Sequence, residues 1–238
     1  MYDAFHGHVP HIAHMTFPAS GSRTRCLSPI MLKINVVEYD PRWPIQYEQI
    51  ARELRHAMSD FLPAEGFVIH HIGSTSVHGL AAKPIIDIDI VVEPNFIMEA
   101  TQALTSHSYT YAYERGGIDR MVFRFNKHKL DSGASTATED GSPRRAVYLN
   151  KVGGAALTNH LAFRDALRKD PVAIIEYGKL KMTLAKEEHA DIAAYGARKY
   201  DFIMGLLERS GLSEGEISRI QSRPRRRIDE WLEAPVQP

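Results

Sequence analysis

Two aspartates stand inside the most apolar stretch of the chain. Asp87 and Asp89 are one residue apart, and isoleucines and valines fill the rest of residues 85–92. Side chains alternate along a strand, so both carboxylates should point to the same side, roughly 6.5–7 Å apart. Two buried like charges are costly unless an opposite charge compensates them. A divalent cation would do so, and carboxylate oxygens suit Mg²⁺, with Mn²⁺ as an alternative.

A second arrangement of this strand is equally compatible with the pattern. The two aspartates would face solvent on an open side of a sheet, while residues 86, 88 and 90 pack into the core. The turn that precedes the strand favours the metal site. Gly73 and Ser74 directly follow a predicted strand at 66–72, and Thr75 continues the small polar run. Glycine lets the backbone approach a ligand closely, and free N–H groups with a serine hydroxyl can hold phosphate oxygens.

A phosphate-binding turn on one strand beside an Asp-x-Asp on the next resembles the nucleotidyltransferase superfamily. Longer motifs narrow the resemblance to the GrpB family, a branch of that superfamily, over about residues 34–209. The motifs are "VVEYDPRWP", "HIGSTSVHGLAAKPIIDIDIVV", "FRDALRKDP", "YGKLK" and "YGARKYDFI". The resemblance implies that Gly73 and Ser74 bind phosphate and that Asp87 and Asp89 are the catalytic metal ligands. It implies no particular substrate.

The chain departs from the pattern of this family at two places. His78 stands where the family usually has proline. Active nucleotidyltransferases carry a third carboxylate on a neighbouring strand, but the corresponding strand here reads "AVYLNKV", with Tyr148 and Asn150 at the alternating positions. The histidine that GrpB-like sequences tend to have in this strand is missing as well. No general base for an attacking hydroxyl is therefore visible in the sequence.

Three lysines are candidate phosphate ligands. Lys83 stands just before the aspartate strand, and Lys181 and Lys199 each follow a tyrosine by four residues. Each tyrosine could stack on a base while its lysine binds the phosphates. Ordinary interhelix packing with extended lysines explains the same spacing. Of the adjacent His70 and His71, one should face inward as a core histidine.

The periodicity predicts an α+β fold with a mixed sheet, flanking helices and a helical C-terminal part. The resemblance to the GrpB family implies that this sheet is nucleotidyltransferase-like. Strands are expected at 34–39, 66–72, 85–92, 109–113, 120–125 and 146–152, and helices at 41–60, 95–106, 159–169, from 171, and at 190–209. A turn at 116–117 and a polar loop at 131–143 are expected too. We expect residues 1–30 to be a disordered and dispensable leader, and a histidine-rich metal tract is the alternative. The expected domains are 31–156, the helical part 157–211 and a basic tail 212–238.

Composition excludes several classes of protein. The formal net charge of zero argues against a broad surface for nucleic acid, which is not indicated as a partner. The single cysteine, Cys26, excludes an internal disulfide framework and favours a reducing compartment. No apolar run approaches the ~20 residues that span a bilayer, so we expect a cytoplasmic protein without a membrane partner.

The leading hypothesis is a Mg²⁺-dependent nucleotidyltransferase-like protein. It would bind a nucleoside triphosphate through Gly73, Ser74 and Thr75 together with the three lysines, and would transfer a nucleoside monophosphate to an unknown acceptor. The first alternative is a non-catalytic nucleotide-binding or interaction module that has lost the third acidic residue. An antitoxin-like or accessory protein acting through the helical part is another.

Overall fold

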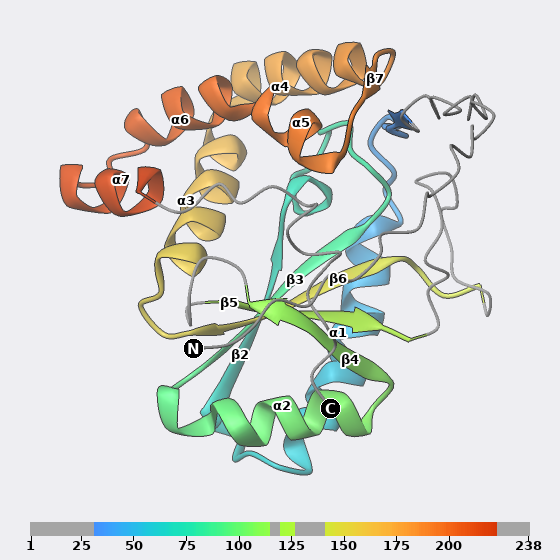
Figure 1. The fold of residues 1–238 in the computed structure, drawn as a ribbon, viewed down its shortest axis with the longest axis vertical. Helices are drawn as coiled ribbons and strands as arrows, with labels where there is room; N and C mark the ends of the chain where they lie inside the picture. The colour runs from blue at the N-terminus through green and yellow to red at the C-terminus, as the bar shows by residue number, and fades with distance from the viewer. Residues whose placement is uncertain (1–30, 115–119, 127–140, 223–238) are drawn as a thin grey trace, which may run out of the picture.

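The computed structural model describes residues 31–114, 120–126 and 141–222. A five-stranded mixed sheet forms the centre of the molecule, and α-helices flank it (Figure 1). In chain order the elements are β1 Leu32–Lys33, α1 Trp43–Ser59, η1 Ala64–Gly66, β2 Phe67–Ile72, η2 Ser74–Ser76, β3 Ile86–Val92, η3 Pro94–Phe96, α2 Ile97–Ser106, β4 Tyr109–Glu114, β5 Arg120–Phe125, β6 Arg145–Lys151, α3 Ala155–Lys169, α4 Pro171–Leu184, β7 Glu188–His189, α5 Ile192–Ala197, α6 Tyr200–Glu208 and α7 Glu214–Gln221.

The strand order of the sheet is β2-β3-β6-β5-β4. Only β3 and β6 run parallel, and every other neighbouring pair is antiparallel. The register places His70 and Tyr148 on either side of Asp89. Because cross-strand partners point to the same face, these residues share one face of the sheet with Asp87.

The two faces of β3 have different roles. Its even-numbered residues, Ile86, Ile88, Ile90 and Val92, are buried in a core with residues of α1 and α2. The opposite face carries Asp87 and Asp89 and lies on the side of α3, which contacts β2 and β6. Asp89 is 0% exposed. The alternative of an open, solvated aspartate face is therefore wrong for Asp89, which the helical part covers.

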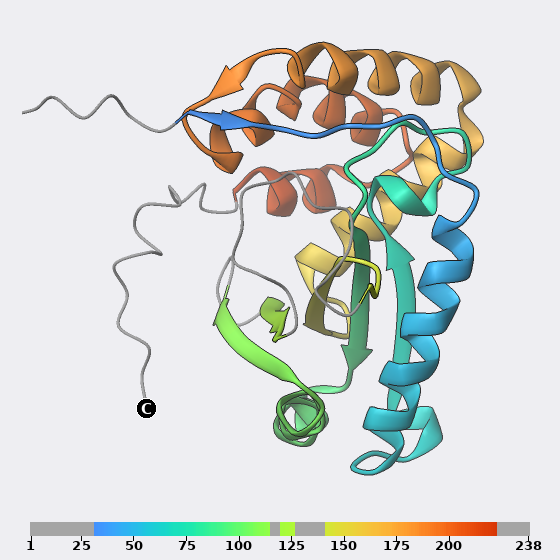
Figure 2. The same cartoon turned by 90° about the vertical axis from the view of Figure 1, so that its right-hand side faces the viewer.

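The helical part has cores of its own. Figures 1 and 2 show the C-terminal helices, orange to red, gathered at one end of the sheet, with α2 at the other. One core joins Val77 and Leu80, from the segment after the Gly73 turn, to residues of α3, α4 and α6. A second joins Ala81 to Leu184 and Tyr195. The segment between β2 and β3 therefore packs against the C-terminal helices and connects them to the sheet.

Local sequence explains where several elements begin. The Asp170 carboxylate accepts hydrogen bonds from the N–H groups of Val172 and Ala173, both at 3.0 Å, and Pro171 starts α4 as predicted. At α1 the Asp40 carboxylate accepts from the Arg42 N–H, and the helix starts at Trp43.

Some predicted elements were wrong. Residues 34–39 form no regular strand and contribute one isolated bridge, between Val37 and Ala82. The single helix predicted at 190–209 is two helices, α5 and α6, and the two-residue strand β7 pairs with β1 in the part expected to be purely helical. Helix α3 begins at Ala155 after Gly154, so Asn159 is not its cap. The leader 1–30, the turn at 116–117, most of the loop 131–143 and the tail beyond 222 lie outside the described residues.

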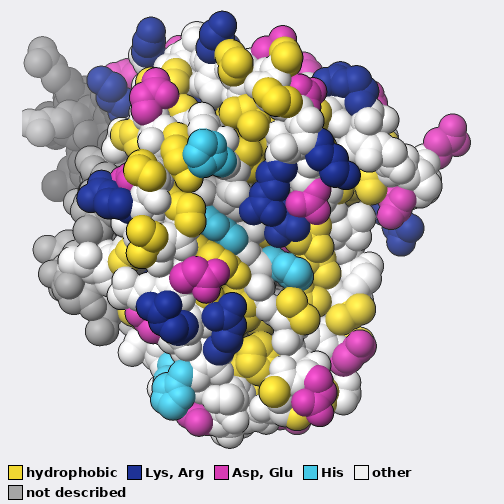
Figure 3. Space-filling view, turned by 180° about the vertical axis from the view of Figure 1, so that it is seen from behind, with side chains coloured by type: hydrophobic (Ala, Val, Ile, Leu, Met, Phe, Trp, Pro, Cys, Tyr) yellow, Lys and Arg dark blue, Asp and Glu magenta, His cyan; other side chains and the backbone are white. Residues whose placement is uncertain are grey.

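Basic and acidic side chains lie interspersed on the face shown in Figure 3, and histidines are among them. Within the described ranges, none of the helices is both long and apolar enough to span a membrane.

Candidate functional site

Asp87 and Asp89 project from β3 into different surroundings on the same face. Asp89 is fully buried, and its Oδ2 lies 2.8 Å from Nδ1 of His160 on α3. Its Oδ1 is buried without a hydrogen-bond partner among the described residues. Asp87 is partly exposed, and its Oδ1 accepts a hydrogen bond of 3.4 Å from the hydroxyl of Tyr148. Burial raises the pKa of Asp87, and the nearby positive charge of Lys83 opposes this rise.

The turn after β2 approaches Asp87 closely. Gly73 has φ +68°, a left-handed conformation that favours glycine. A Cβ at this position would lie 2.9 Å from the Cβ of Asp87 and closer still to its carboxylate. The turn ends in the 3-10 helix η2, in which the Ser76 hydroxyl donates to the Gly73 carbonyl at 2.6 Å. Gly73 therefore brings the backbone of the predicted phosphate-binding turn against the first aspartate.

Ser74 and Thr75 differ in what they can contribute. Ser74 is partly exposed. Thr75 is 1% exposed, donates to the carbonyl of Ile85 at 3.2 Å and lies 3.1 Å from Nε2 of His71. Its hydroxyl thus ties the turn to the segment that enters β3. This leaves the Thr75 backbone N–H, rather than the side chain, as the group that could meet a ligand.

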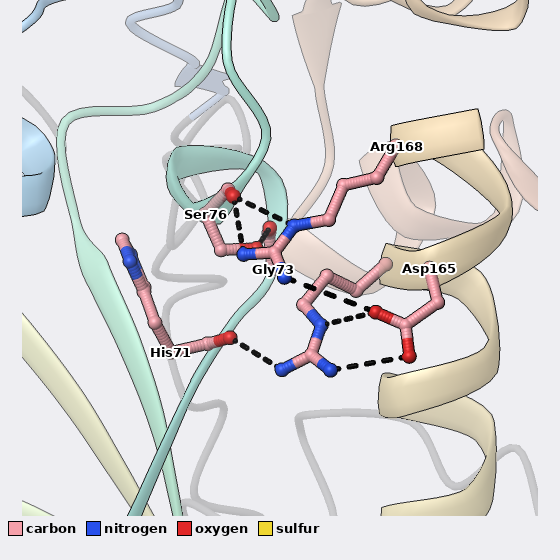
Figure 4. Close-up of polar contacts among 6 residues, drawn as sticks. His71, Gly73, Ser76, Asp165 and Arg168 are labelled. Atoms are coloured by element: carbon pink, nitrogen blue, oxygen red, sulfur yellow. Dashed lines mark hydrogen bonds and ion pairs between the residues drawn. The ribbon is translucent and has the colours of Figure 1, made fainter. Parts of the chain in front are cut away.

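Two arginines of α3 donate hydrogen bonds to backbone carbonyls next to this turn (Figure 4). Nη1 of Arg164 donates to the carbonyl of His71 at 3.1 Å, and Arg168 donates to the carbonyl of Ser76 at 2.8 Å. Asp165 pairs with Arg164 at 2.7 Å. These two carbonyls flank the Gly73 turn, and Arg164 and Arg168 are one helical turn apart. Helix α3 therefore fixes both ends of the turn.

His70 and His71 follow the predicted alternation. His71 is buried, stacks on the ring of Tyr47 at 4.5 Å and contacts Thr75. Burial lowers its pKa to about 3, so it is neutral near pH 7. His71 is therefore the inward-facing core histidine, while His70 is partly exposed beside Asp89.

The three candidate lysines all lie near enough to Asp87 for its charge to affect them. Lys83 and Lys199 both lie over the ring of Tyr195, with Nζ at 6.0 and 4.2 Å from its centre. Lys181 is 3% exposed, lies 4.5 Å from the centre of the Tyr177 ring and donates to the carbonyl of Ala81.

Burial and mutual repulsion affect the charge of these lysines. Burial lowers the pKa of Lys181 to about 6, and the charges of Lys199 and Lys83 add to that effect while Asp87 opposes it. Burial also lowers the pKa of Lys199 to about 8, again with a contribution from Lys83. The pKa of Lys83 is lowered by burial and raised by Asp87. Three lysine amines thus lie near one partly exposed carboxylate, which cannot keep all of them charged, so the site is favourable for an added anion.

Among the residues that the structure describes, no third carboxylate joins the two aspartates in a group that could hold a metal. Tyr148 and Asn150 occupy β6 as the sequence indicated, and Asn150 is 0% exposed with both side-chain polar atoms unpartnered in the described ranges. Those ranges contain no group of three or more His, Cys, Asp or Glu side chains that could hold a metal ion by itself.

His160 is the site residue that sequence reasoning missed. It lies in α3, far from β3 in the chain, and reaches Asp89 only because the helix packs over the sheet. One signal was available: His160 precedes Arg164 and Arg168 by four and eight residues, so the three side chains share one helix face.

The mixed sheet, the covering helices and the glycine turn beside two strand aspartates define an α+β protein with the site layout that the sequence motifs indicated. The family model described as "GrpB protein" matches residues 33–209. The chain belongs to this family, as the sequence motifs indicated.

Bacterial relatives can be aligned with this chain over most of their length. A UPF0157 protein of Streptomyces coelicolor is 31% identical over 185 residues, which cover 77% of this chain and 87% of that protein. A UPF0157 protein of Halalkalibacterium halodurans is 27% identical over 186 residues, covering 77% of this chain and 86% of that protein.

The crystal structure of the conserved protein GrpB from Enterococcus faecalis has a similar fold. It aligns with a TM-score of 0.57 and 28% identity, covering 74% of this chain and 96% of that chain. The Cid1 poly(U) polymerase bound to MgGTP aligns with a TM-score of only 0.38 and 10% identity, over 61% of this chain and 45% of that chain. A likeness so remote supports no conclusion about function.

Proposed function

We propose that this protein binds a nucleoside triphosphate together with Mg²⁺ at the face of β3 that carries Asp87 and Asp89. The observation that carries the proposal is the pair of carboxylates on one strand face, one of them fully buried with Oδ1 unpartnered in the described part of the chain. A buried carboxylate oxygen without a partner is costly unless a ligand or water meets it.

The residues present fit a metal that arrives with phosphate. Mg²⁺ usually uses one or two carboxylates and fills its other positions with water and substrate phosphates. Asp87 and Asp89 would supply those carboxylates, and a bound Mg²⁺ would neutralise charge on the phosphates. The lack of a third metal ligand among the described side chains agrees with a site completed by substrate.

The surrounding groups suit the triphosphate itself. The N–H groups of the Gly73 turn and the Ser74 hydroxyl would hold phosphate oxygens next to Asp87. Lys83, Lys181 and Lys199 would supply positive charge near Asp87, where burial and repulsion lower the pKa of each. A polyphosphate would relieve that repulsion and favour the charged form of each lysine.

The reaction that such a site would support is transfer of a nucleoside monophosphate. The oxygen of an acceptor hydroxyl would form a bond to the α-phosphorus, the bond from the α-phosphorus to the α–β bridging oxygen would break, and pyrophosphate would leave. The hydroxyl proton would pass to a base or to water. Positioning and charge stabilisation, rather than covalent participation of the protein, would account for the rate.

A non-catalytic nucleotide-binding module is the second candidate. The observation that favours it is the replacement of the third acidic position by Tyr148 and Asn150 on β6. Both candidates predict binding of Mg²⁺ with a triphosphate, and they differ in turnover. Release of pyrophosphate in the presence of an acceptor supports transfer, whereas binding without release supports the module.

A thermal-shift screen tests the binding proposal. The four ribonucleoside triphosphates are added to the full chain with Mg²⁺ or with EDTA. We expect one or more to stabilise the protein only with Mg²⁺, by about 2.7 kcal/mol when the free ligand is 100 times its dissociation constant. The variant with Asp87→Asn and Asp89→Asn should lose the shift.

Asp60→Asn is the matched control for that variant. Asp60 follows α1, is half exposed and lies beside His107, which follows α2. Neither residue belongs to the candidate site, so Asp60→Asn should leave the thermal shift unchanged. Stabilisation of the double variant equal to that of the wild type would overturn the proposal, as would a wild type that no triphosphate stabilises.

A further inference from the structure

A chain of hydrogen bonds links β5 to the buried aspartate through α3. Nη1 of Arg120 lies 2.7 Å from Nε2 of His160, and Nδ1 of His160 lies 2.8 Å from Oδ2 of Asp89. Both ring nitrogens of His160 are therefore engaged, one by a guanidinium and one by a carboxylate.

The chemistry of the two partners fixes the tautomer of His160. A guanidinium carries only donors, so Nε2 must accept the hydrogen bond from Arg120. A neutral imidazole has one N–H, which then lies on Nδ1 and donates to Asp89. An imidazole protonated at Nε2 would place two donors against each other at 2.7 Å.

The same arginine is linked to Asp87 through Tyr148. Its guanidinium carbon lies 5.0 Å from the centre of the Tyr148 ring, and the Tyr148 hydroxyl donates to Oδ1 of Asp87. Arg120 is 8% exposed, so both contacts are made away from bulk water.

We infer that Arg120 and His160 are positioning residues that orient Asp89, with its Oδ2 held by the Nδ1–H of His160 and its Oδ1 left as the metal-facing oxygen. This inference rests on the proposed function for the identity of the ligand. It assigns to a histidine of α3 a role that no residue of β6 fulfils. Groups that support a ligating carboxylate in this way typically change metal affinity by 10–100-fold when they are removed.

The tautomer is measurable in the metal-free protein. Two-bond ¹H–¹⁵N spectra of histidine-labelled protein distinguish a protonated Nδ1 from a protonated Nε2. We expect His160 to show the Nδ1–H form in the wild type. In Arg120→Met, Asp89 still requires a proton on Nδ1, but Nε2 is no longer restricted to accepting, so a form protonated on both nitrogens should appear as well. An Nε2–H form in the wild type would overturn the inference, whatever the protein binds.

Metal affinity tests the role of the contact. The probe is Mn²⁺ in the presence of inorganic tripolyphosphate, with bound and free Mn²⁺ separated by electron paramagnetic resonance. We expect His160→Phe to weaken Mn²⁺ binding by about 10–100-fold. His160→Asn, whose amide N–H takes the place of Nδ1–H, should recover most of it. His107→Phe, at the end of α2, is the matched control and should bind as the wild type does.

The outcomes separate this inference from the proposed function. A folded His160→Phe or His160→Asn protein with wild-type Mn²⁺ affinity would show that the contact is merely structural. A wild type that binds no Mn²⁺ with tripolyphosphate would overturn the proposed function and the metal-facing assignment of Oδ1 together. The spectrum alone still decides whether Arg120 fixes the tautomer.

Discussion

The backbone of Gly73 packs against the side chain of Asp87, and no Cβ fits between them. A Cβ built on Gly73 would lie 2.9 Å from the Cβ of Asp87, and φ of +68° already disfavours any other residue. This contact joins the turn after β2 to the first aspartate of β3. The proposed phosphate and metal groups are thereby held as one unit.

Gly73→Ala should consequently be more harmful than its backbone angle alone explains. Gly79 has a similar φ of +77° but nothing within 4 Å of a built Cβ, so Gly79→Ala isolates the cost of backbone strain. We expect that cost to be about 1–3 kcal/mol and the loss in Gly73→Ala to exceed it. Urea denaturation of both variants gives the comparison, and equal losses would mean that the close approach to Asp87 is absent in solution.

The two aspartates should respond differently to neutralisation when metal is absent. Burial raises the pKa of Asp87, so the folded state binds a proton more readily than the unfolded state. Its ionised form therefore costs stability, and the free energy of unfolding falls as pH rises from the ordinary aspartate pKa through the raised one. Asp87→Asn should remove this fall and be at least as stable as the wild type at pH 7.

Asp89→Asn should instead be less stable, because a neutral amide oxygen replaces the charged oxygen that accepts a hydrogen bond from His160. A hydrogen bond to a charged group contributes about 1.5–3 kcal/mol. Urea denaturation in EDTA between pH 4 and 8 measures both variants. Asp87→Asn less stable than Asp89→Asn would show that Asp87, rather than Asp89, is the structural carboxylate.

Polyphosphate binding should take up a proton at Lys181. Burial lowers the pKa of Lys181 to about 6, so the free protein holds this lysine mostly neutral at pH 7.5. A bound polyanion favours the charged form and draws a proton from the buffer. Calorimetric titration of tripolyphosphate in two buffers of different ionisation enthalpy should show uptake of up to about one proton.

Lys181→Met is the variant that checks this assignment. It should lose most of the proton uptake and should not be destabilised at pH 7.5, because the wild type stabilises little charge at that position. The wild type should also become more stable as pH rises above about 6, where the unfolded state binds the extra proton. Identical heats in the two buffers would contradict the location of Lys181 beside the polyanion.

The hold of α3 on the turn should appear in hydrogen exchange. Nη1 of Arg164 donates to the carbonyl of His71, and within the turn the amide of Val77 donates to the carbonyl of Ser74 at 3.2 Å. Arg164→Ala should speed exchange of the Ser76 and Val77 amides by about tenfold, equivalent to about 1.4 kcal/mol. Lys169→Ala, on the same helix, is the control and should leave both exchange rates unchanged. Unchanged rates in Arg164→Ala would contradict the prediction and would mean that the turn is rigid without α3.

Much of this fold follows from short-range patterns in the sequence. The apolar run around Asp87 identified β3, and Asp170 with Pro171 identified the start of α4. The strand predicted at residues 34–39 was wrong, because apolar side chains there pack against helices instead of pairing in the sheet. Ile34 and Val36 lie in a core with Leu184 and Tyr195. Tertiary packing overrode strand propensity at that point.

The site was predictable as far as it is local in the sequence. Gly73 and Asp87 could be joined because a known motif spans both. His160 could not, because its contact with Asp89 bridges 71 residues and depends on how α3 crosses the sheet. The same limit applies to the lysines. Their spacing to tyrosines suggested Lys181 and Lys199 as candidates. Lys181 lies in α4 and Lys199 directly before α6, and only tertiary packing brings both close enough to Lys83 to interact with its charge.

The most direct test of the central claim is calorimetric titration of the full chain with each ribonucleoside triphosphate, in Mg²⁺ and in EDTA. The account predicts binding near one ligand per chain for at least one triphosphate in Mg²⁺. The affinity should fall at least about tenfold in EDTA and in the variant with Asp87→Asn and Asp89→Asn, equivalent to 1.4 kcal/mol or more. Absence of binding by the wild type, or binding that neither EDTA nor the double substitution weakens, would contradict it.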